Sequence, residues 1–186
     1  MKKDEPNGPL PLSPGDEIVV VPMDAPPANE VVEVVMDLQR AGLRATLGDE
    51  AAVPPSALDP ARGQLRVERL LALARERNGR RVLALTARDL FIEGTPFVFG
   101  AADAPGRVAV VSLFRLHVGA DGDAFRARVL KEATRLIGRT IGLADCAHPR
   151  CVMHPAGTLT AIDAKSSRLC GTCLLQASRR VRRPGP

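Results

Sequence analysis

The sequence contains no tryptophan and no tyrosine, and only 5 phenylalanines among its 186 residues. Aromatic side chains form the platforms on which single-stranded bases usually stack, so their scarcity argues against nucleic-acid binding. No apolar run approaches the roughly twenty residues of a membrane span. The first residues, MKKDEPNGPLPLSPGD, hold charges and prolines where a secretion signal needs an apolar segment. We therefore expect a cytoplasmic protein that does not associate with membranes.

The excess of positive charge is concentrated near one end of the sequence. The formal net charge is +5, from 26 basic and 21 acidic residues. Four arginines stand in the segment RRVRRPGP, namely Arg179, Arg180, Arg182 and Arg183. Without these four, 22 basic residues face 21 acidic ones, so the rest of the chain is nearly neutral. We expect a solvated tail, with binding to an acidic partner or a nucleic acid as the alternative.

Length and composition predict one compact domain. The chain has 186 residues, of which 45% are apolar, which is enough to bury a core. Residues 1–16 hold four prolines and two glycines, so we expect a flexible leader. The domain is predicted over residues 17–176, followed by a basic tail at 177–186. We find no internal repeat.

The hydrophobic pattern alternates between strands and helices. Strands are predicted at EIVVVPM (17–23), LRATL (43–47) and RVLALT (81–86), and helices at residues 29–42 and 64–79. For the first helix we expect Asn29 as N-cap and Gly42 as the stop. Two strand-like runs within residues 97–116 flank Pro105 and Gly106, which predicts a hairpin. Alternating strands and helices indicate an α/β (α+β) fold with some parallel pairing.

A long helix is predicted to begin near Asp123. Its apolar positions recur at helical spacing: Phe125, Val129, Ala133, Ile137 and Ile141. Its charged positions share the other side: Arg128, Lys131, Glu132, Arg135 and Arg139. We expect this charged side to be a solvated surface on which Glu132 pairs with Arg128 or Arg135.

All four cysteines stand in the last quarter of the chain: Cys146, Cys151, Cys170 and Cys173. Close cysteine pairs joined by a longer loop are typical of a tetrahedral structural zinc site. We favour one such site, formed by a part of the domain at about residues 146–176. Two disulfides, a redox pair at CGTC and buried thiols remain the alternatives. The nearby His148 and His154 are interpreted as loop residues.

The spacing of these cysteines, together with Gly142 and Met153, resembles the archaemetzincins, a family of metzincin-type zinc peptidases. The family pattern is His-Glu-x-x-His-x-x-Gly-x-x-His-Cys, then four residues to a second Cys, then x-Met, and later Cys-x-x-Cys. The segments DPARGQLRVERLL, ARDL, PFVFGAAD, VAVVSLFRL and AIDAK are also similar to family segments. The resemblance covers about residues 17–176.

The resemblance implies a metzincin-like mixed sheet with packed helices, an active-site-type helix and a Met-turn at Met153. It also implies two zinc ions, a structural one on the four cysteines and a catalytic one. Carried over by position, the three histidine ligands of the catalytic zinc correspond to Arg135, Arg139 and Asp145. The glutamate that acts as general base corresponds to Leu136.

These four residues do not supply the chemistry of the family's catalytic site. A guanidinium group stays protonated and offers no lone pair, and leucine cannot accept a proton. Asp145 alone does not make a zinc site. We therefore expect one zinc, a structural one, and no catalytic residue. We further expect Asp145 to accept hydrogen bonds from Arg135, Arg139 or both.

Three functions remain open at this point. The first is a proteolytically inactive pseudo-metallopeptidase that binds a peptide, protein or anionic ligand in its cleft, where one net positive charge would remain. An extended peptide would pair with a sheet edge beside that cleft. The second is an active zinc metallopeptidase or other hydrolase with a rebuilt site. The third is an acidic-partner or nucleic-acid-binding module that uses the arginine tail.

Overall fold

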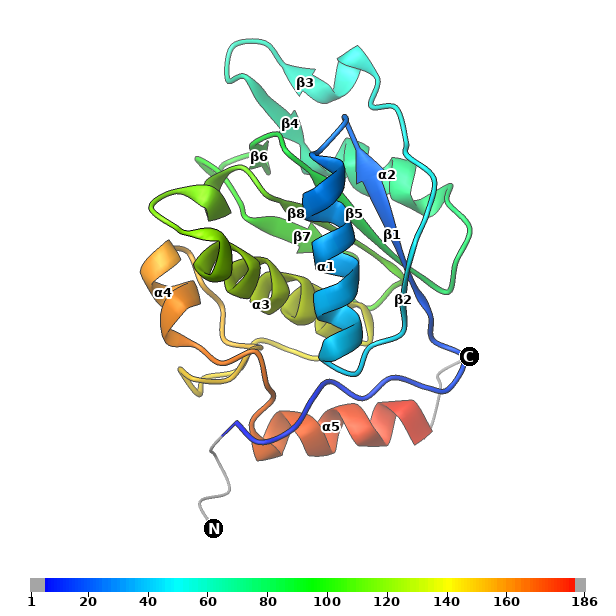
Figure 1. The fold of residues 1–186 in the computed structure, drawn as a ribbon, viewed down its shortest axis with the longest axis vertical. Helices are drawn as coiled ribbons and strands as arrows, with labels where there is room; N and C mark the ends of the chain where they lie inside the picture. Colours follow the sequence, from blue (N-terminus) through cyan, green and yellow to red (C-terminus); the bar gives the residue numbers. More distant parts are fainter. Residues whose placement is uncertain (1–5, 183–186) are drawn as a thin grey trace.

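A mixed five-stranded sheet forms the centre of the protein in the computed structural model, which describes residues 6–182 (Figure 1). The strand order is β2-β1-β5-β8-β7. The strands are β1 (Ile18–Met23), β2 (Ala45–Leu47), β5 (Arg81–Thr86), β7 (Gly100–Ala102) and β8 (Val108–Ser112). All neighbours pair in parallel except β7, which is antiparallel to β8. The predicted strands and the hairpin are thus confirmed.

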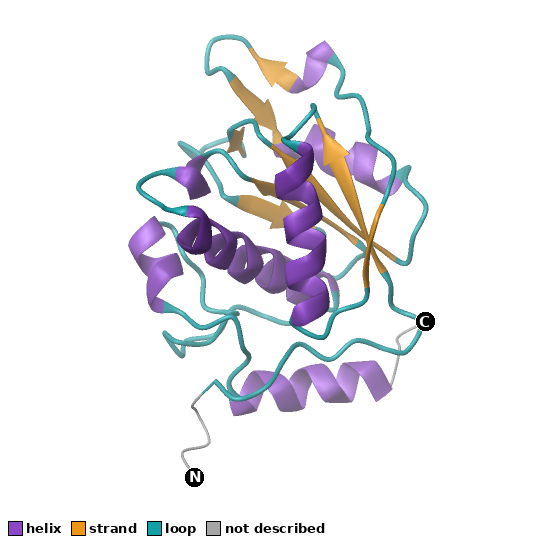
Figure 2. Cartoon of the chain, viewed as in Figure 1, coloured by secondary structure: helices purple, strands orange, loops and turns teal. Residues whose placement is uncertain are grey.

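Helices cover both faces of this sheet (Figure 2). The first face carries α1 (Ala28–Arg40) and α3 (Gly122–Thr140), and the second carries α2 (Val67–Arg75). Neighbouring residues of a strand point to opposite faces, so Val20 joins the core under α1 and α3 while Val21 joins the core under α2. Continuous β-branched runs are expected for strands that are buried on both sides.

A small second sheet lies beside the main one. It consists of β3 (Leu58–Asp59), β4 (Gln64–Arg66) and β6 (Leu90–Phe91). The short 3-10 helix η1 (Pro55–Ala57) precedes β3, and a second one, η2 (Arg115–His117), lies between β8 and α3 in the chain. The helix predicted at residues 64–79 is therefore wrong at its start. Leu65 pairs with both Leu58 and Leu90 and is buried, so tertiary pairing outweighs the helical propensity of this segment.

The start of α1 also differs from the prediction. Pro27 occupies the N-cap position, no side chain of the described residues 6–182 caps the helix, and Asn29 lies within its first turn. The fixed φ of proline suits the entry to a helix. The predicted stop is confirmed, because Gly42 has a φ of +86° and its N–H donates to the carbonyl of Gln39.

Both ends of the described chain lie against the domain. The short helix α4 (Leu159–Ala164) precedes α5 (Gly171–Arg182), and the N-terminal segment runs beside α5 (Figure 1). Gly8 forms an antiparallel bridge with Leu169, and Leu10 is only 4% exposed. Leader residues 7–10 are therefore packed rather than flexible, since Leu10 joins the main core.

The predicted tail is helical as far as it is described. α5 continues to Arg182, so the boundary expected at residue 177 falls inside a helix, and Ala177 is fully buried. Arg183 lies outside the described residues, as do residues 1–5 and the side chain of Arg182. Between residues 6 and 182, we find no helix with the length and apolar character needed to cross a bilayer.

Candidate metal centre and cleft

Helix α3 positions most of the residues singled out in the sequence. Asp121 caps its first turn by accepting a hydrogen bond from the Ala124 N–H at 2.8 Å. The helix ends at Thr140, and Gly142, whose φ is +85°, then reverses the chain direction. The Leu143 N–H then donates to the Gly138 carbonyl at 3.0 Å. This turn sends the chain toward Asp145 and the first cysteine.

A buried ion network surrounds Glu132 on α3. Its carboxylate accepts from Lys165 Nζ at 2.7 Å and from Arg135 Nη2 at 2.9 Å. The side chains of Glu132 and Lys165 are both 0% exposed. Lys165 follows α4 and also donates to the His154 carbonyl at 3.2 Å. The network thus ties α3 to the loop after Met153 and to the end of α4.

The charges of this network set its protonation. Burial by itself would raise the pKa of Glu132, but the charges of Arg135 and Lys165 outweigh it and hold that pKa below its ordinary value. Burial lowers the pKa of Lys165, an effect that the contact with Glu132 offsets in part. Glu132 is therefore a carboxylate near neutral pH.

The predicted partner of Glu132 is confirmed, but the predicted exposure of the pair to solvent is wrong. Arg135 is its partner, as one alternative stated, but the pair is buried instead of lying on a solvated surface. Arg128, the other alternative, is 6% exposed and binds Asp163 through two hydrogen bonds of 2.8 Å. The charged side of α3 faces the segments that follow Met153, so it is an interior face.

The expected contact of Asp145 is confirmed only as a loose ion pair. Arg139 Nη1 lies 3.8 Å from Asp145 Oδ1, which is beyond hydrogen-bond distance, and donates to the Leu143 carbonyl at 3.0 Å. The carboxylate is 52% exposed, so the attraction is strongly screened. Of the two arginines expected as partners, Arg139 is the one that approaches Asp145, because Glu132 holds the guanidinium group of Arg135.

A small cavity lies beside Arg135, which is the one of the four carried-over positions found in its lining. Its volume is about 130 Å³, and its lining includes Phe97, Phe99, Gly100, Arg135 and Gly157. β7 is the last strand of the main sheet on this side. Leu136 is 2% exposed and lies so close to β7 that a Cβ at Gly100 would be 2.7 Å from its Cδ1. Leu136 is therefore part of the apolar core beside the cavity.

Met153 packs against α3 at Gly138. It is fully buried in a turn in which the His154 N–H donates to the Cys151 carbonyl at 3.0 Å. A Cβ at Gly138 would lie 2.6 Å from its Sδ atom, so the absence of a side chain at Gly138 makes room for the sulfur. The assignment of Met153 to a Met-turn remains a prediction.

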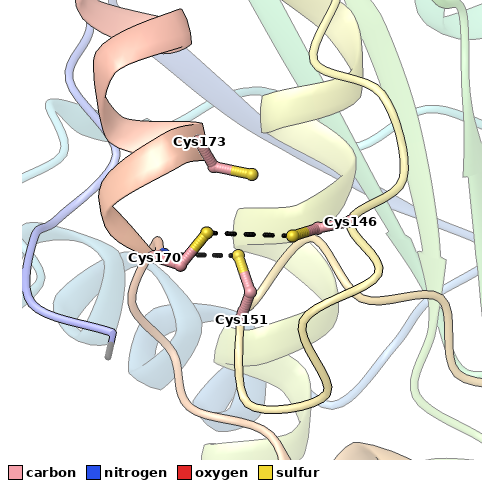
Figure 3. Close-up of side chains that lie close together, drawn as sticks. All are labelled: Cys146, Cys151, Cys170 and Cys173. Carbon is pink, nitrogen blue, oxygen red and sulfur yellow. Dashed lines mark hydrogen bonds between the residues drawn. The ribbon is translucent and has the colours of Figure 1, made fainter. Parts of the chain in front are cut away.

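The four cysteines converge between the loop after α3 and the start of α5. Figure 3 shows their sulfur atoms pointing toward one another. The Sγ atoms of Cys146 and Cys170 are 3.7 Å apart, and all four sulfurs lie within 4.8 Å of one another. All four are free thiols, so the two-disulfide alternative does not describe this structure. Within residues 6–182 no other cluster of His, Cys, Asp or Glu is placed to hold a metal ion.

Backbone amides support the sulfur atoms. The Cys170 N–H donates to Cys151 Sγ at 3.3 Å, and the His148 N–H donates to Cys146 Sγ at 3.4 Å. Burial raises the pKa of Cys151 to about 11 and also raises that of Cys173. At Cys170 burial has the same tendency, but hydrogen bonds from the Cys173 backbone and neighbouring thiols lower its pKa. Four thiolates this close together would need a cation to offset their repulsion.

This arrangement fits a tetrahedral zinc. With Zn–S bonds of about 2.3 Å, neighbouring sulfur ligands are about 3.8 Å apart, close to the observed separation of 3.7 Å. The cluster can therefore hold a metal ion. His148 and His154 lie outside it, and the His154 ring bonds the Cys146 carbonyl at 2.8 Å. Both histidines are loop residues, as predicted.

The positions that the resemblance assigns to a catalytic zinc do not fit one. Arg135 and Arg139 offer no lone pair, and Arg135 is held by Glu132. Asp145 is the one carboxylate among the three ligand positions. Because these residues provide no ligand set, we derive no chemical step through a metal there.

Lys165 is the residue at this site that the sequence did not reveal. It stands 33 residues after Glu132, and no periodic pattern links the two positions. The segment AIDAK, which ends at Lys165, is similar to a family segment but does not identify a partner for the lysine. Full burial of a lysine is rare unless it is paired, so only the folded structure reveals this contact.

Comparison with known proteins agrees with this fold and cysteine arrangement. Residues 62–179 match the model of Peptidase family M54. An archaemetzincin from Natronomonas pharaonis is 36% identical over 169 residues, which is 83% of this chain and 98% of that protein. The crystal structure of the Methanopyrus kandleri archaemetzincin matches with a TM-score of 0.80 at 32% identity, covering 91% of this chain and 98% of that one.

A second solved structure extends the comparison. The Archaeoglobus fulgidus archaemetzincin, complexed with malonate, matches with a TM-score of 0.75 at 28% identity. The match covers 86% of this chain and 99% of that one. The mixed sheet, its packed helices and the clustered cysteines are thus found in a chain that matches the family model over more than half its length. The protein belongs to Peptidase family M54, the archaemetzincins.

Proposed function

We propose that this protein is a proteolytically inactive member of its family. In this proposal Cys146, Cys151, Cys170 and Cys173 hold one structural zinc, and the cleft beside β7 contains no metal. The cleft binds a peptide or another anionic ligand without cleaving it. Cytoplasmic location is part of the same proposal, because cysteines kept as thiols are typical of a reducing compartment.

The observation that carries the proposal is the ion network around Glu132. Where the family pattern places its first histidine and its general base, this chain has Arg135 and Leu136. Arg135 is bonded to Glu132, and Leu136 is packed against β7. Two arginines repel a dication, and a leucine cannot activate water. The contact from Lys165 to Glu132 joins α3 to the following loop, a cross-link that a zinc would otherwise supply.

Zinc content per chain tests the metal part of the proposal. Protein is purified without a metal-affinity step and measured by elemental analysis. We expect one zinc, lost when Cys170 and Cys173 are replaced by serine and retained in an Asp145→Asn control. Two zinc ions would mean that a second site exists and would overturn the metal-free cleft, while none would overturn the structural zinc.

Hydrolysis assays test the catalytic part. We expect no cleavage of a mixed peptide library above buffer, with or without added zinc. Cleavage that survives repurification and is abolished by Asp145→Asn would refute inactivity and favour the hydrolase with a rebuilt site. The Asp145→Asn variant separates true activity from a contaminating protease, because the latter is unaffected.

The cleft favours an anionic group of modest size. Arg135 uses Nε and Nη2 toward Glu132 and lines the cavity of about 130 Å³, which is room for about four water molecules. Glu132, Asp145, Arg135, Arg139 and Lys165 together carry one net positive charge. The open edge of β7 provides backbone groups with which an extended peptide can pair.

Malonate is a suitable first probe, since it is the anion in one solved relative. In an NMR titration of the zinc-loaded chain we expect saturable shifts at the amides of Phe99 and Gly157, weakened at least about tenfold by Arg135→Gln. An Arg69→Gln control, which changes an exposed arginine on α2, leaves them unchanged. Shifts that are indifferent to Arg135→Gln would contradict anion binding in the cleft.

A further inference from the structure

A larger cavity lies between the end of α1, the middle of α3 and the N-terminal segment. Its volume is about 550 Å³, which is within the range of small-molecule sites. Its apolar walls include Leu10, Leu43 and Leu130, from three separate parts of the chain. None of its lining residues belongs to the cysteine cluster or to the small cavity around Arg135. The cavity is thus distinct from the sites described above.

A buried hydroxyl group in its lining has no partner. Thr134 lies on α3, is 3% exposed, and lines the cavity. Its Oγ1 atom makes no hydrogen bond within the described part of the chain. A buried polar group without a partner costs stability, and almost all such groups in folded proteins are satisfied. A bound molecule with a polar group near Thr134 would satisfy it.

The charged groups at this cavity favour a negative ligand. Arg40 and Arg168 both line it. Each guanidinium group has five N–H donors, and within residues 6–182 Arg40 bonds only Asp37 and Arg168 bonds only the Asn7 carbonyl. Among the described residues of the lining, Asp37 is the one acidic group, and it is occupied by Arg126 at 2.6 and 2.9 Å and by Arg40 at 2.9 Å. Donors therefore remain for an anion, while the carboxylate is already neutralised.

We propose that this cavity binds a small carboxylate with an apolar body, such as a medium-chain fatty acid or the apolar C-terminal residue of a peptide. The apolar body lies against Leu10, Leu43 and Leu130. The carboxylate accepts hydrogen bonds from Arg40 and Arg168, and the Thr134 hydroxyl group gains a partner. This site does not depend on whether the M54 cleft is active, because it shares no residue with that cleft.

The test is an NMR titration of the zinc-loaded full chain with octanoate, using octan-1-ol and inorganic phosphate as matched probes. Octanol keeps the apolar body without the charge, and phosphate keeps a charge without the body. We expect saturable shifts at the amides of Leu43 and Thr134 with octanoate, at least about tenfold weaker binding of octanol, and no saturable shift with phosphate. A peptide that ends in leucine is titrated beside the same peptide with a C-terminal amide. Binding of the free peptide but not of the amide would identify a peptide C-terminus as a ligand, and binding of octanoate alone would identify a free fatty acid.

Variants separate the proposed contacts from general effects. Arg168→Gln is expected to weaken the binding of octanoate about tenfold and to leave the binding of octanol unchanged. Thr134→Val is expected to weaken the binding of octanoate without altering the NMR spectrum of the ligand-free protein away from the cavity. Arg69→Gln, far from the cavity in sequence and exposed, serves as control. Equal binding of octanol and octanoate, indifference to Arg168→Gln, or the absence of saturation up to about 10 mM would each overturn the proposal. Shifts confined to Phe99 and Gly157 would do the same, because they would place the anion in the M54 cleft.

Discussion

Replacement of Glu132 by glutamine removes the single negative charge of the buried ion network while keeping the shape of the side chain. Within residues 6–182, Lys165 and Arg135 then have no counter-charge in direct contact, and the side chain of Lys165 is 0% exposed. Removing one partner of a buried ion pair costs about 3–5 kcal/mol, since the other charge stays buried and unpaired. Domains of this size are stable by about 5–15 kcal/mol, so Glu132→Gln should consume a large part of the total stability.

Lys165→Met is the informative companion to this variant. In it, Glu132 keeps its contact with Arg135 at 2.9 Å, so the loss is close to one charge-assisted hydrogen bond, about 1.5–3 kcal/mol. In the double variant no lysine charge is left buried without a counter-charge, so the loss of unfolding free energy should not exceed that of Glu132→Gln alone. The two changes are therefore expected to be strongly non-additive.

Urea unfolding measured by far-UV circular dichroism gives these free energies, because a chain without tryptophan lacks the usual fluorescence signal. All samples contain equal zinc, so that metal binding contributes equally. Additive losses in the double variant, or a loss below about 1 kcal/mol for Glu132→Gln, would refute the claim that the network holds α3 against the following loop.

Three further predictions concern the same part of the molecule. The folded pKa of Glu132 is lowered, so its stabilisation is complete above the unfolded pKa of about 4.3 and is lost as the pH falls through the folded pKa. The difference in unfolding free energy between the protein and Glu132→Gln should therefore shrink below about pH 4 in urea titrations. A difference that stays constant with pH would contradict this. Gly138→Ala places a Cβ 2.6 Å from Met153 Sδ and should lower the free energy of unfolding by about 1–3 kcal/mol. Gly122→Ala is the control, because a Cβ there meets no atom of residues 6–182 within 4 Å, and it should cause no measurable loss in the same assay. Removing zinc with a chelator should lower the melting temperature and expose the Leu169 amide to hydrogen exchange before the amides of β5, and unchanged exchange at Leu169 would count against a structural metal.

The main sheet was predictable because its signals are local. β1, β5 and β8 are continuous apolar runs with few alternative structures, and each appears where it was expected. The cysteine cluster was also predictable, since zinc-ligand spacing is encoded over a short stretch of sequence. The start of α2 was not, because Leu65 is drawn into β4 by its partners Leu58 and Leu90, and pairing across the chain leaves no trace in a local window.

The charged face of α3 shows a second limit of sequence analysis. Helical periodicity correctly grouped Arg128, Glu132 and Arg135 on one side, but a polar face is expected to be solvated. Here it is covered by the segments after Met153, which bring Asp163 and Lys165 as partners. Whether a polar face is inside or outside depends on what packs over it, and this is a property of the tertiary fold.

The bridge between the N-terminal segment and the residues before α5 has a consequence for biosynthesis. The Asn7 N–H donates to the Leu169 carbonyl at 3.0 Å, and Asn7 and the neighbouring Arg168 are 161 residues apart. At about 5–20 residues per second, a ribosome needs roughly 8–30 s to make the chain between them. During this time Asn7 and Gly8 have no bridge to Leu169, and the cluster cysteine Cys173 is still to come. The N-terminal segment therefore gains this backbone bridge only after the chain between its two sides has been made.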